Sequence, residues 1–514
     1  MKKLLLLAAA IFVVMLACAP EPERPRCNHE WGEWQTEKTA TCAEEGLRIR
    51  PCLHCYSWDD EIIEKLTNHS WGAWEITKPA TCEAEGTRRQ TCTRCGSLNN
   101  GTIPKLTGSQ CGGGGGNQGA VIKPSSWNIS QIQTRYDNYR REHLAAPTPS
   151  GNRYIKAGGT NYGGQIVTQS EAHGYGMMIF ALMANTSMAR GDERAIFDGM
   201  NQMRRGHPSS SQGAGHLMSW VVFSGHENNT LPSQTPAPQW PDTSPGRRSS
   251  ATDGDFDMAY ALLLAQKVWG GDYEEQAKLI INQLRQLCMG PNSKRTLLGD
   301  WARNSWTQTG TNPDPQSLNT RSSDWMPGHF RAFHRATGDV FWLDAIDTIY
   351  ALLGQVSNRE TGLMPDFVTG RPAVADPKGG GTTGENNQVH YANNACRVPW
   401  RLATHWVHYE DQRAKTQIDK ISTWLRGATN GNPTIEANRI RHGYHLDGKP
   451  LDPNSWGAMH FVAPFAAGMI ADPANQQFLN NTWTWMMNNN PRDAYQAAIQ
   501  LLCMLLITGH WQAP

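Results

Sequence analysis

Four stretches of the chain repeat apolar residues at the spacing of an α-helix and are too long to be strands: residues 174–186, 257–270, 341–356 and 494–509. Gly270 and Gly509 close two of them, as glycine does at many helix ends. Alternating strand patterns are scarce after about residue 121, where long loops rich in Gly, Asn, Pro and Ser separate the helical stretches. The pattern therefore predicts one large all-α domain over residues 121–514, with loops able to form a cleft.

The N-terminal region instead contains an internal repeat. "HEWGEWQTEKTATCAEEGLRIRPCLHC", from His29, matches "HSWGAWEITKPATCEAEGTRRQTCTRC", from His69, with a period of 40 residues and no gap. The repeats are assigned to residues 24–66 and 67–107 and resemble small cysteine-containing ribbon modules of bacterial surface proteins. Units this short bury too little apolar surface to fold without a metal or a disulfide.

Each repeat offers one His and three Cys, a known ligand set for structural zinc. The predicted ligands are His29, Cys42, Cys52 and Cys55 in the first repeat and His69, Cys82, Cys92 and Cys95 in the second. Disulfides are the alternative, because residues 27–111 contain an even eight cysteines. The His that recurs in register with the cysteines favours zinc, since a disulfide does not need it.

Residues 1–17 have the character of an export signal, with Lys2 and Lys3 ahead of an apolar run and small residues before Cys18. The segment before Cys18 resembles a bacterial lipoprotein signal, which implies a lipid anchor on that cysteine; an ordinary secreted protein is the alternative. We therefore expect an extracytoplasmic protein. A glycine-rich linker at residues 108–120 separates the repeats from the helical domain.

Charge and motif content narrow the function. The 47 Lys and Arg residues nearly balance the 46 Asp and Glu residues, which gives no indication of a nucleic-acid partner. The chain contains neither HExxH nor G-x-S-x-G, and the glycines from Gly158 follow no clear strand, which makes them a weak phosphate-loop candidate. Twenty tryptophans suit a surface that grips sugars, although most tryptophans lie in protein cores.

Carboxylates are the remaining candidates for chemistry. Asp253, Asp255 and Asp257 lie at the start of one predicted helix, and Glu171 lies at the start of another. Helix capping by acids is the simpler explanation for each. A calcium loop of the EF-hand type is excluded for the aspartates, because its sixth position would be Met258 rather than Gly. Three acids exceed what capping requires.

Together these segments resemble glycoside hydrolase family 8, a family of inverting endo-glycanases. "ATDGDFDMAYALLLAQKVW" at 251–269 fits the family signature, and "SEAHGYGMM" at 170–178 matches the segment with its catalytic acid. "SSDWMPGHFRAF" at 322, "RVPWR" at 397 and "LLITGHW" at 505 extend the likeness over the helical domain. The resemblance implies an (α/α)6 barrel that acts on a polysaccharide and needs no cofactor for catalysis.

The resemblance also implies residue roles. Inverting hydrolysis needs one protonated carboxyl to donate to the leaving oxygen and one carboxylate to activate water. Glu171 matches the family's acid, and Asp253 matches the aspartate that grips the sugar at the cleavage point. The usual base, an Asp three residues before the R-x-P motif, is Asn394 here, and an amide cannot take a proton from water.

A subgroup of the family with this Asn takes its base from a Glu on an upstream loop. Here the corresponding loop spans residues 369–389, and Glu385 is its only glutamate, so we predict Glu385 as the base. Asp366, in a segment that looks like scaffold, and Asp376, further from the motif, are the alternatives. A solvated loop glutamate with no role also stays open.

The matching segments supply candidates for substrate binding. The aromatic candidates for stacking on sugar faces, each of which could equally be core, are Tyr175, Trp301, Trp325 and Trp400. Arg397 is expected to bond to the substrate or hold the base loop, and Asn394 to contact the substrate.

The sequence thus predicts an exported inverting endo-β-1,4-glycanase. Residues 120–514 hold 34 Lys and Arg and 32 Asp and Glu, which favours neutral β-glucan over the polycation chitosan. The Asn-type base loop favours chitosanase, and xylan is a further alternative. A carbohydrate-binding surface protein that has lost its base is the alternative from another class.

Overall fold

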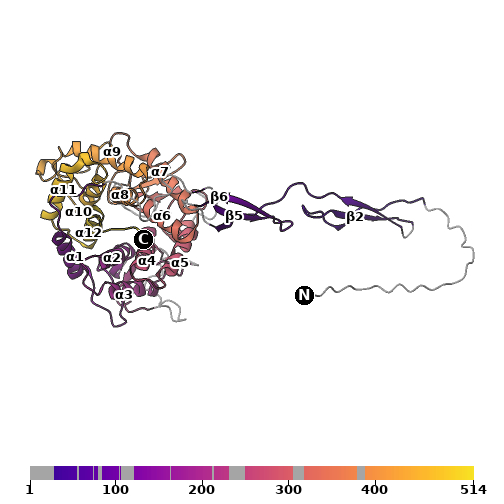
Figure 1. Ribbon diagram of the computed structural model, residues 1–514, viewed down its shortest axis with the longest axis horizontal. Coiled ribbons are helices and arrows are strands. Elements are labelled where there is room, and N and C mark those ends of the chain that lie inside the picture. Colours follow the sequence, from indigo (N-terminus) through magenta and orange to yellow (C-terminus); the bar gives the residue numbers. More distant parts are fainter. Residues whose placement is uncertain are drawn as a thin grey trace, which may run out of the picture. The chain divides into compact units, whose positions relative to one another are not determined.

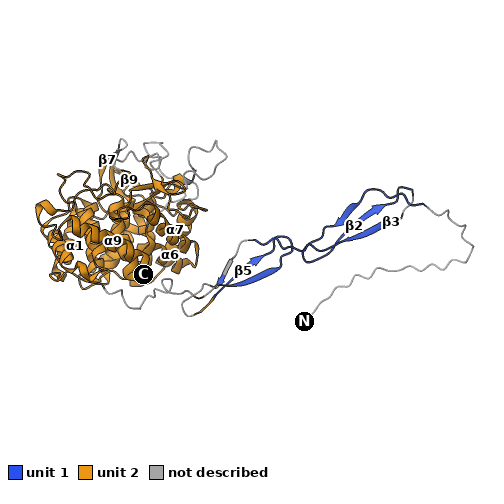
Figure 2. Ribbon diagram, turned by 90° about the horizontal axis from the view of Figure 1, so that it is seen from above, with its two compact units in different colours: residues 1–79, 86–104 blue, residues 80–85, 105–514 orange. Residues whose placement is uncertain are grey.

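The computed structural model describes residues 28–54, 57–72, 75–78, 84–103, 105, 121–161, 164–210, 214–230, 249–304, 318–378 and 388–514. The chain divides into two compact units, residues 1–79 with 86–104 and residues 80–85 with 105–514 (Figure 2). In the described parts of the chain, no helix has both the length and the apolar character needed to cross a bilayer. The predicted leader with Cys18 lies outside the described residues.

The smaller unit contains two three-stranded antiparallel sheets, one in each repeat. Their strands are β1 (Gln35–Lys38), β2 (Gly46–Pro51) and β3 (Trp58–Ile63), then β4 (Glu75–Lys78), β5 (Gly86–Thr91) and β6 (Leu98–Ile103). Gly46 pairs with Ile63 and Gly86 with Ile103, so the 40-residue period is repeated in the strand register. The only described apolar residues that this unit buries are Ala40, Cys52 and Cys92.

The larger unit is a barrel of α-helices (Figure 1). Six inner helices are buried on nearly all faces: α2 (Ser170–Ala184), α4 (Thr252–Trp269), α6 (Pro327–Thr337), α8 (Val398–Tyr409), α10 (Met459–Met469) and α12 (Ala494–Thr508). Each contacts the next, and α12 contacts α2, so the ring closes. These helices are apolar on every side because they pack against inner and outer neighbours at once.

Six outer helices precede the inner ones in turn along the chain. They are α1 (Ile129–His143), α3 (Glu193–Gly206), α5 (Tyr273–Leu287), α7 (Phe341–Val356), α9 (Gln412–Ala428) and α11 (Gln476–Asn488). Each outer helix buries apolar residues on the face toward the inner helices and exposes polar residues on the face toward solvent. Because outer and inner helices alternate, the inner helices run in the same direction and their N-terminal ends lie at one end of the barrel.

Two small antiparallel sheets, which the helical pattern did not predict, accompany the barrel. One consists of β7 (Gly159–Asn161), β8 (Gly164–Gln169) and β9 (Val221–Phe223), and β8 leads directly into α2. The other consists of β10 (Thr320–Arg321), β11 (Phe367–Thr369) and β12 (Val374–Ala375). The prediction of an (α/α)6 barrel preceded by two ribbon-like repeats is confirmed.

Candidate active site

Polar side chains from five inner helices and their leading turns meet at the N-terminal end of the barrel. Glu171 and Asp253 lie in the first turns of α2 and α4, and Arg397 directly precedes α8. His460 and Tyr495 begin α10 and α12. Exposed N–H groups and the helix dipoles at such ends favour negative charge. The fold thus collects carboxylates and their partners in one place.

Close packing of α2 against α4 brings the two predicted acids together. A Cβ added at Gly174 would lie 2.9 Å from the carbonyl oxygen of Gly254, and one added at Gly254 would lie 2.6 Å from the carbonyl carbon of Ser170. Only glycine fits such a helix crossing. The glycines of the two motifs therefore set the position of Glu171 against Asp253.

Glu171 has the environment of a carboxyl that can hold a proton. Its side chain is 24% exposed and pairs with Nη1 of Arg397. The hydroxyl of Tyr175 donates to Oε1 of Glu171 at 3.2 Å. Burial raises the pKa of Glu171 above its ordinary value, Arg397 opposes the shift, and the negative charge of Asp253 adds to it. A carboxyl with a raised pKa beside a cleft is suited to proton donation.

Asp253 lies between two guanidinium groups and is nearly buried. Nη1 of Arg397 lies 3.3 Å from Oδ2 of Asp253, and Nη2 of Arg321 lies 3.2 Å from Oδ1. One nitrogen of Arg397 therefore contacts both Asp253 and Glu171. The two guanidinium groups thus hold the Asp253 carboxylate in place.

The other two aspartates of the motif support the fold. Oδ1 of Asp255 accepts from the backbone N–H of Met218 at 2.8 Å. Asp257 accepts two hydrogen bonds from Arg401, at 2.8 and 2.7 Å, and lies 2.8 Å from Nε2 of His329. Oδ1 of Asp253 accepts from the backbone N–H of Gly254 in the first turn of α4 at 3.0 Å, so capping accounts for only one of the three aspartates.

Arg321 and Asp324, which the sequence analysis did not select, complete this side of the site. Nε of Arg321 donates to Oδ1 of Asp324 at 3.1 Å. Burial raises the pKa of Asp324 to about 6, with Arg321 opposing the shift and Asp253 adding to it. The signal was present at the quoted "SSDW" segment, where Arg321, one residue before it, and Asp324 flank two serines shortly before α6.

The turn before α8 presents amides where the family resemblance led us to expect an acid. Nδ2 of Asn394 donates to Oδ2 of Asp366 at 3.2 Å, and its Oδ1 accepts from Arg397 at 3.0 Å. Asp366 also accepts from the backbone N–H groups of Ala392, Asn394 and Ala395, at 3.0, 3.1 and 2.7 Å. Asp366 is thus the anchor of this turn, in agreement with its interpretation as scaffold.

Asn393, next in the turn, is exposed and faces a pocket of about 460 Å³ that Glu171, Asn394 and Arg397 also line. Its Oδ1 lies 3.1 Å from Nε2 of His442 and 3.2 Å from Nε2 of His460. Burial lowers the pKa of His460 to about 3, so this imidazole stays neutral and donates through Nε2. The pocket wall around Asn393 is therefore formed by an amide and a neutral imidazole.

Comparison with known proteins assigns this barrel to a family. The sequence profile of the glycosyl hydrolases family 8 matches residues 123–506. The chain belongs to glycosyl hydrolases family 8. It is therefore a glycoside hydrolase, and its N-terminal repeats lie outside the family match.

Two relatives and one solved structure have similar sequences. A beta-glucanase from Niallia circulans is 32% identical, over 74% of this chain and 85% of the relative. An endoglucanase from Bacillus sp. (strain KSM-330) is 31% identical, over 77% of this chain and 81% of the relative. The apo structure of a beta-1,3-1,4-glucanase from Paenibacillus sp. X4 has a TM-score of 0.64 and 31% identity, and covers 77% of this chain and 96% of that chain. Rex8A from Paenibacillus barcinonensis shares the fold, with a TM-score of 0.55 and 19% identity. The match covers 75% of this chain and 94% of that chain.

Three of the predicted sugar-stacking residues of this family 8 chain are core residues. Tyr175, Trp325 and Trp400 are each 0% exposed, so their faces cannot reach a substrate, and their selection as binding residues is corrected. Trp301 is partly buried against a small cluster that contains Leu298 and Phe367. The aromatic residues that do line the pocket are Trp456 and Tyr495, outside the motifs that guided the selection.

Glu385, the predicted base, lies outside the described residues, and its role stays a prediction. Asp376, the alternative, is buried, and its Oδ1 accepts from the backbone N–H of Lys378 at 2.9 Å. Its carboxylate therefore organises its own turn.

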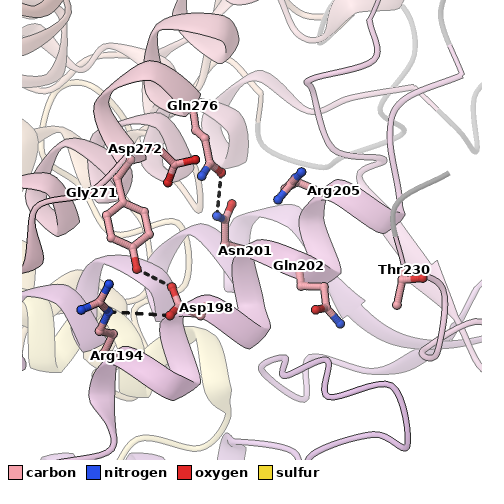
Figure 3. Close-up of a pocket in the computed structure, with 10 residues that line it drawn as sticks. Arg194, Asp198, Asn201, Gln202, Arg205, Thr230, Gly271, Asp272 and Gln276 are labelled. Carbon is pink, nitrogen blue, oxygen red and sulfur yellow. Dashed lines mark hydrogen bonds and ion pairs between the residues drawn. The ribbon is translucent and has the colours of Figure 1, made fainter. Parts of the chain in front are cut away.

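A separate hollow of about 520 Å³ lies between α3 and α5 (Figure 3). Nδ2 of Asn201 donates to Gln276 there at 2.8 Å, and the Tyr273 hydroxyl bonds to Asp198. These contacts join two outer helices. None of the described candidate residues lines this hollow, so we do not assign it to catalysis.

Among the described residues of the repeats, one group of side chains could hold a metal: Cys42, His69, Cys92 and Cys95. The prediction had assigned Cys42 to a set with His29, Cys52 and Cys55 of its own repeat. That grouping is corrected, because Cys42 lies with ligands of the second repeat. Cys55 and Cys82 lie outside the described residues.

Proposed function

We propose that this family 8 chain is an inverting endo-β-1,4-glycanase that hydrolyses neutral β-glucan. The relatives at 31 to 32% identity are named beta-glucanase and endoglucanase, and the similar solved structure is a beta-1,3-1,4-glucanase. The near-neutral charge of the catalytic region supports an uncharged polymer over a polycation.

The observation that carries the proposal is the position of Glu171 on the wall of the pocket. The carboxyl is partly exposed, raised in pKa by burial and bonded to Tyr175 and Arg397. We assign it as the acid that donates a proton to the leaving glycosidic oxygen. Asp253, held between Arg321 and Arg397, accepts hydrogen bonds from the sugar at the cleavage point and helps hold the ring distorted.

The base must take a proton from the water that attacks the opposite face of the sugar. Asn394 cannot do so, and Asp366 has its oxygens occupied by four donors in a buried position. Glu385 is the carboxylate of the upstream loop, only three residues before Gln388, whose carbonyl accepts from the backbone N–H of Phe367 in β11. We therefore assign Glu385 as the base.

A substrate panel tests the proposal. Reducing-sugar release is measured on mixed-linkage β-glucan, carboxymethyl cellulose, chitosan and xylan for the wild type, Glu385→Gln and the control Asp376→Asn. We expect hydrolysis of the two glucans and a loss of about 100-fold or more in Glu385→Gln alone. NMR of the first product should show the inverted anomer. If the wild type hydrolyses chitosan or xylan faster than the glucans, the proposed substrate is wrong. If Glu385→Gln keeps most of the wild-type activity, Glu385 is not the base.

Asn394 favours one other function, a surface protein that binds β-glucan without cleaving it. Its signature in the same panel is glucan binding by the wild type with no reducing-sugar release.

We also propose that the enzyme acts outside the cytoplasm, as a lipoprotein anchored at Cys18 or as a secreted protein. The N-terminal sequence supports this proposal. Metabolic labelling with a fatty acid, in the wild type and in Cys18→Ala, distinguishes the anchored form from the secreted one.

A further inference from the structure

The two repeats meet at a group of four side chains that neither repeat could assemble alone. Cys42 belongs to the turn between β1 and β2 of the first repeat, and its Sγ faces the second repeat. His69 precedes β4, and Cys92 and Cys95 lie in the turn between β5 and β6. One possible ligand atom from each of these four residues lies within 4.8 Å of all the others.

The individual distances describe a compact cage of three sulfurs and one nitrogen. Sγ of Cys42 lies 2.8 Å from Sγ of Cys95 and 3.4 Å from Sγ of Cys92. Sγ of Cys95 lies 3.5 Å from Nδ1 of His69. Ligands of a tetrahedral zinc ion, with bonds of about 2.0 to 2.3 Å, are about 3.5 to 3.8 Å apart. Two of the three distances are close to this range, and the sulfurs of Cys42 and Cys95 lie nearer to each other. A disulfide would join only two of the sulfurs, and it would not explain why a third thiol and an imidazole lie beside them.

Backbone hydrogen bonds and one ring contact hold the four ligands in place. The N–H of Leu66, in the segment that joins the repeats, donates to the carbonyl of Thr41 at 3.1 Å, next to Cys42. The imidazole of His69 stacks on Trp71, with ring centroids 4.6 Å apart. Gly96, at φ +72°, closes the turn that carries Cys92 and Cys95, and its N–H donates to the carbonyl of Cys92 at 2.9 Å.

We propose that Cys42, His69, Cys92 and Cys95 bind one zinc ion that joins the first repeat to the second. Thiolate with imidazole in a four-coordinate set is a structural zinc site, and with all positions filled by protein there is no open position for chemistry. The ion takes the place of a core at this junction, because the unit buries so few described apolar side chains. The two repeats then behave as one folded body.

Zinc analysis of single and double variants distinguishes one ion shared by the two repeats from a separate ion in each repeat. The full chain is purified under reducing conditions, and zinc per chain is measured for the wild type, Cys42→Ser, Cys92→Ser and the double variant. A shared ion predicts that each single variant and the double variant lose the same one equivalent. Separate sets predict that the double variant loses two equivalents, which would overturn the proposal.

The period of the repeat supplies a matched control. Cys82 is the counterpart of Cys42, 40 residues further along the chain. The double variant Cys82→Ser with Cys92→Ser should lose more zinc than Cys92→Ser alone only if Cys82 binds a different ion. If Cys82→Ser removes the ion of Cys92 and Cys42→Ser does not, the cross-repeat assignment is wrong.

A variant that retains the ion covers the case in which serine substitutions prevent the repeats from folding. His69→Cys should keep the wild-type zinc content and change the X-ray absorption signature of one ion from three sulfurs and one nitrogen to four sulfurs. An unchanged ligand signature would exclude His69 from the site. Wild-type protein that holds no zinc, with Cys42 found in a disulfide by mass spectrometry, would refute the proposal outright.

Discussion

The two sides of the candidate cleft differ in what they can do with a proton. The side formed by α2, α4 and the turn before α6 presents Glu171, Asp253 and Asp324, held by Arg321 and Arg397. The side formed by the turn before α8 and by α10 presents amides and a neutral imidazole, in Asn393, Asn394 and His460. The first side therefore presents carboxyl groups to the pocket, whereas the second side presents amides and an imidazole.

The two sides also differ in which contacts hold their side chains in position. The acid side is set by helix packing, with glycines at the α2 and α4 crossing and arginines that bridge three carboxylates. The amide side is fixed just as firmly, because Asp366 accepts four hydrogen bonds from it, and none of its described residues offers a free carboxylate. The proposed assignment of Glu385 as the base would supply the carboxylate that these residues lack.

The largest effect is expected from Glu171→Gln, which removes the only proposed proton donor on the acid side. Glutamine keeps the shape and still contacts Tyr175, so folding should be retained while kcat falls about 10²- to 10⁴-fold. Hydrolysis of mixed-linkage β-glucan and thermal melting are the measurements. Glu142→Gln, at an exposed surface position, is the control and should match the wild type. Near wild-type activity in Glu171→Gln would place the acid elsewhere.

A smaller loss and a pH shift are expected from Asp253→Asn. Losing a charged hydrogen-bond partner of the sugar should lower kcat/KM about 10- to 100-fold. Asp253 raises the pKa of Glu171, so its removal lowers that pKa, and Glu171 is active only while protonated. Activity should therefore begin to fall at a lower pH on the alkaline side.

Residual activity of Asp253→Asn across pH measures this shift, with the wild type assayed in the same buffers. An alkaline limb that stays in place or moves to higher pH would show that Glu171 is not the titrating acid, or that Asp253 does not act on it.

Asn394→Asp tests whether the amide side could hold the base itself. The new carboxylate would face Oδ2 of Asp366, now 3.2 Å from the amide nitrogen, and two buried like charges repel. We expect about tenfold lower activity and a melting temperature lower by a few degrees. Asn393→Asp, one residue away but exposed and beside two imidazoles, should be milder and is the matched control. Restored activity when Asn394→Asp is combined with Glu385→Gln would show that residue 394 is the base position.

Much of the barrel and part of the site followed from the sequence. Helical periodicity predicted α2, α4, α7 and α12, and the acids at two helix starts indicated Glu171 and Asp253 because inner helices share one direction. Short strands such as β7 and β10 were missed, since two or three residues carry no readable period. Tyr175, Trp325 and Trp400 were misplaced because apolar residues in the same motifs both pack the barrel and lie near its mouth.

The error in the repeats has a different cause. A period of 40 residues defines how long a unit is but not where it begins. A 40-residue unit that begins at Cys42 would contain Cys42, Cys52, Cys55 and His69, again one His and three Cys. The group of Cys42, His69, Cys92 and Cys95 extends over more than one unit, so the period of the sequence could not predict it wherever the unit is cut.

The smallest expected effect concerns Trp456, an aromatic residue of the pocket that the motifs did not reveal. It is 38% exposed, and the guanidinium of Arg492 lies 3.2 Å from its ring centroid. Arg492 keeps the indole in place at the edge of the pocket, where it can stack on a sugar away from the bond that is cleaved.

Trp456→Ala should raise KM for β-glucan about 2- to 10-fold with little change in kcat, since stacking there stabilises bound substrate and transition state alike. Steady-state kinetics on glucan oligosaccharides of increasing length measure it, with Trp58→Ala, an exposed tryptophan of the first repeat, as the control. A fall in kcat with KM unchanged would instead place Trp456 in contact with the reacting sugar, and the amide side would then contribute to the transition state as well as to binding.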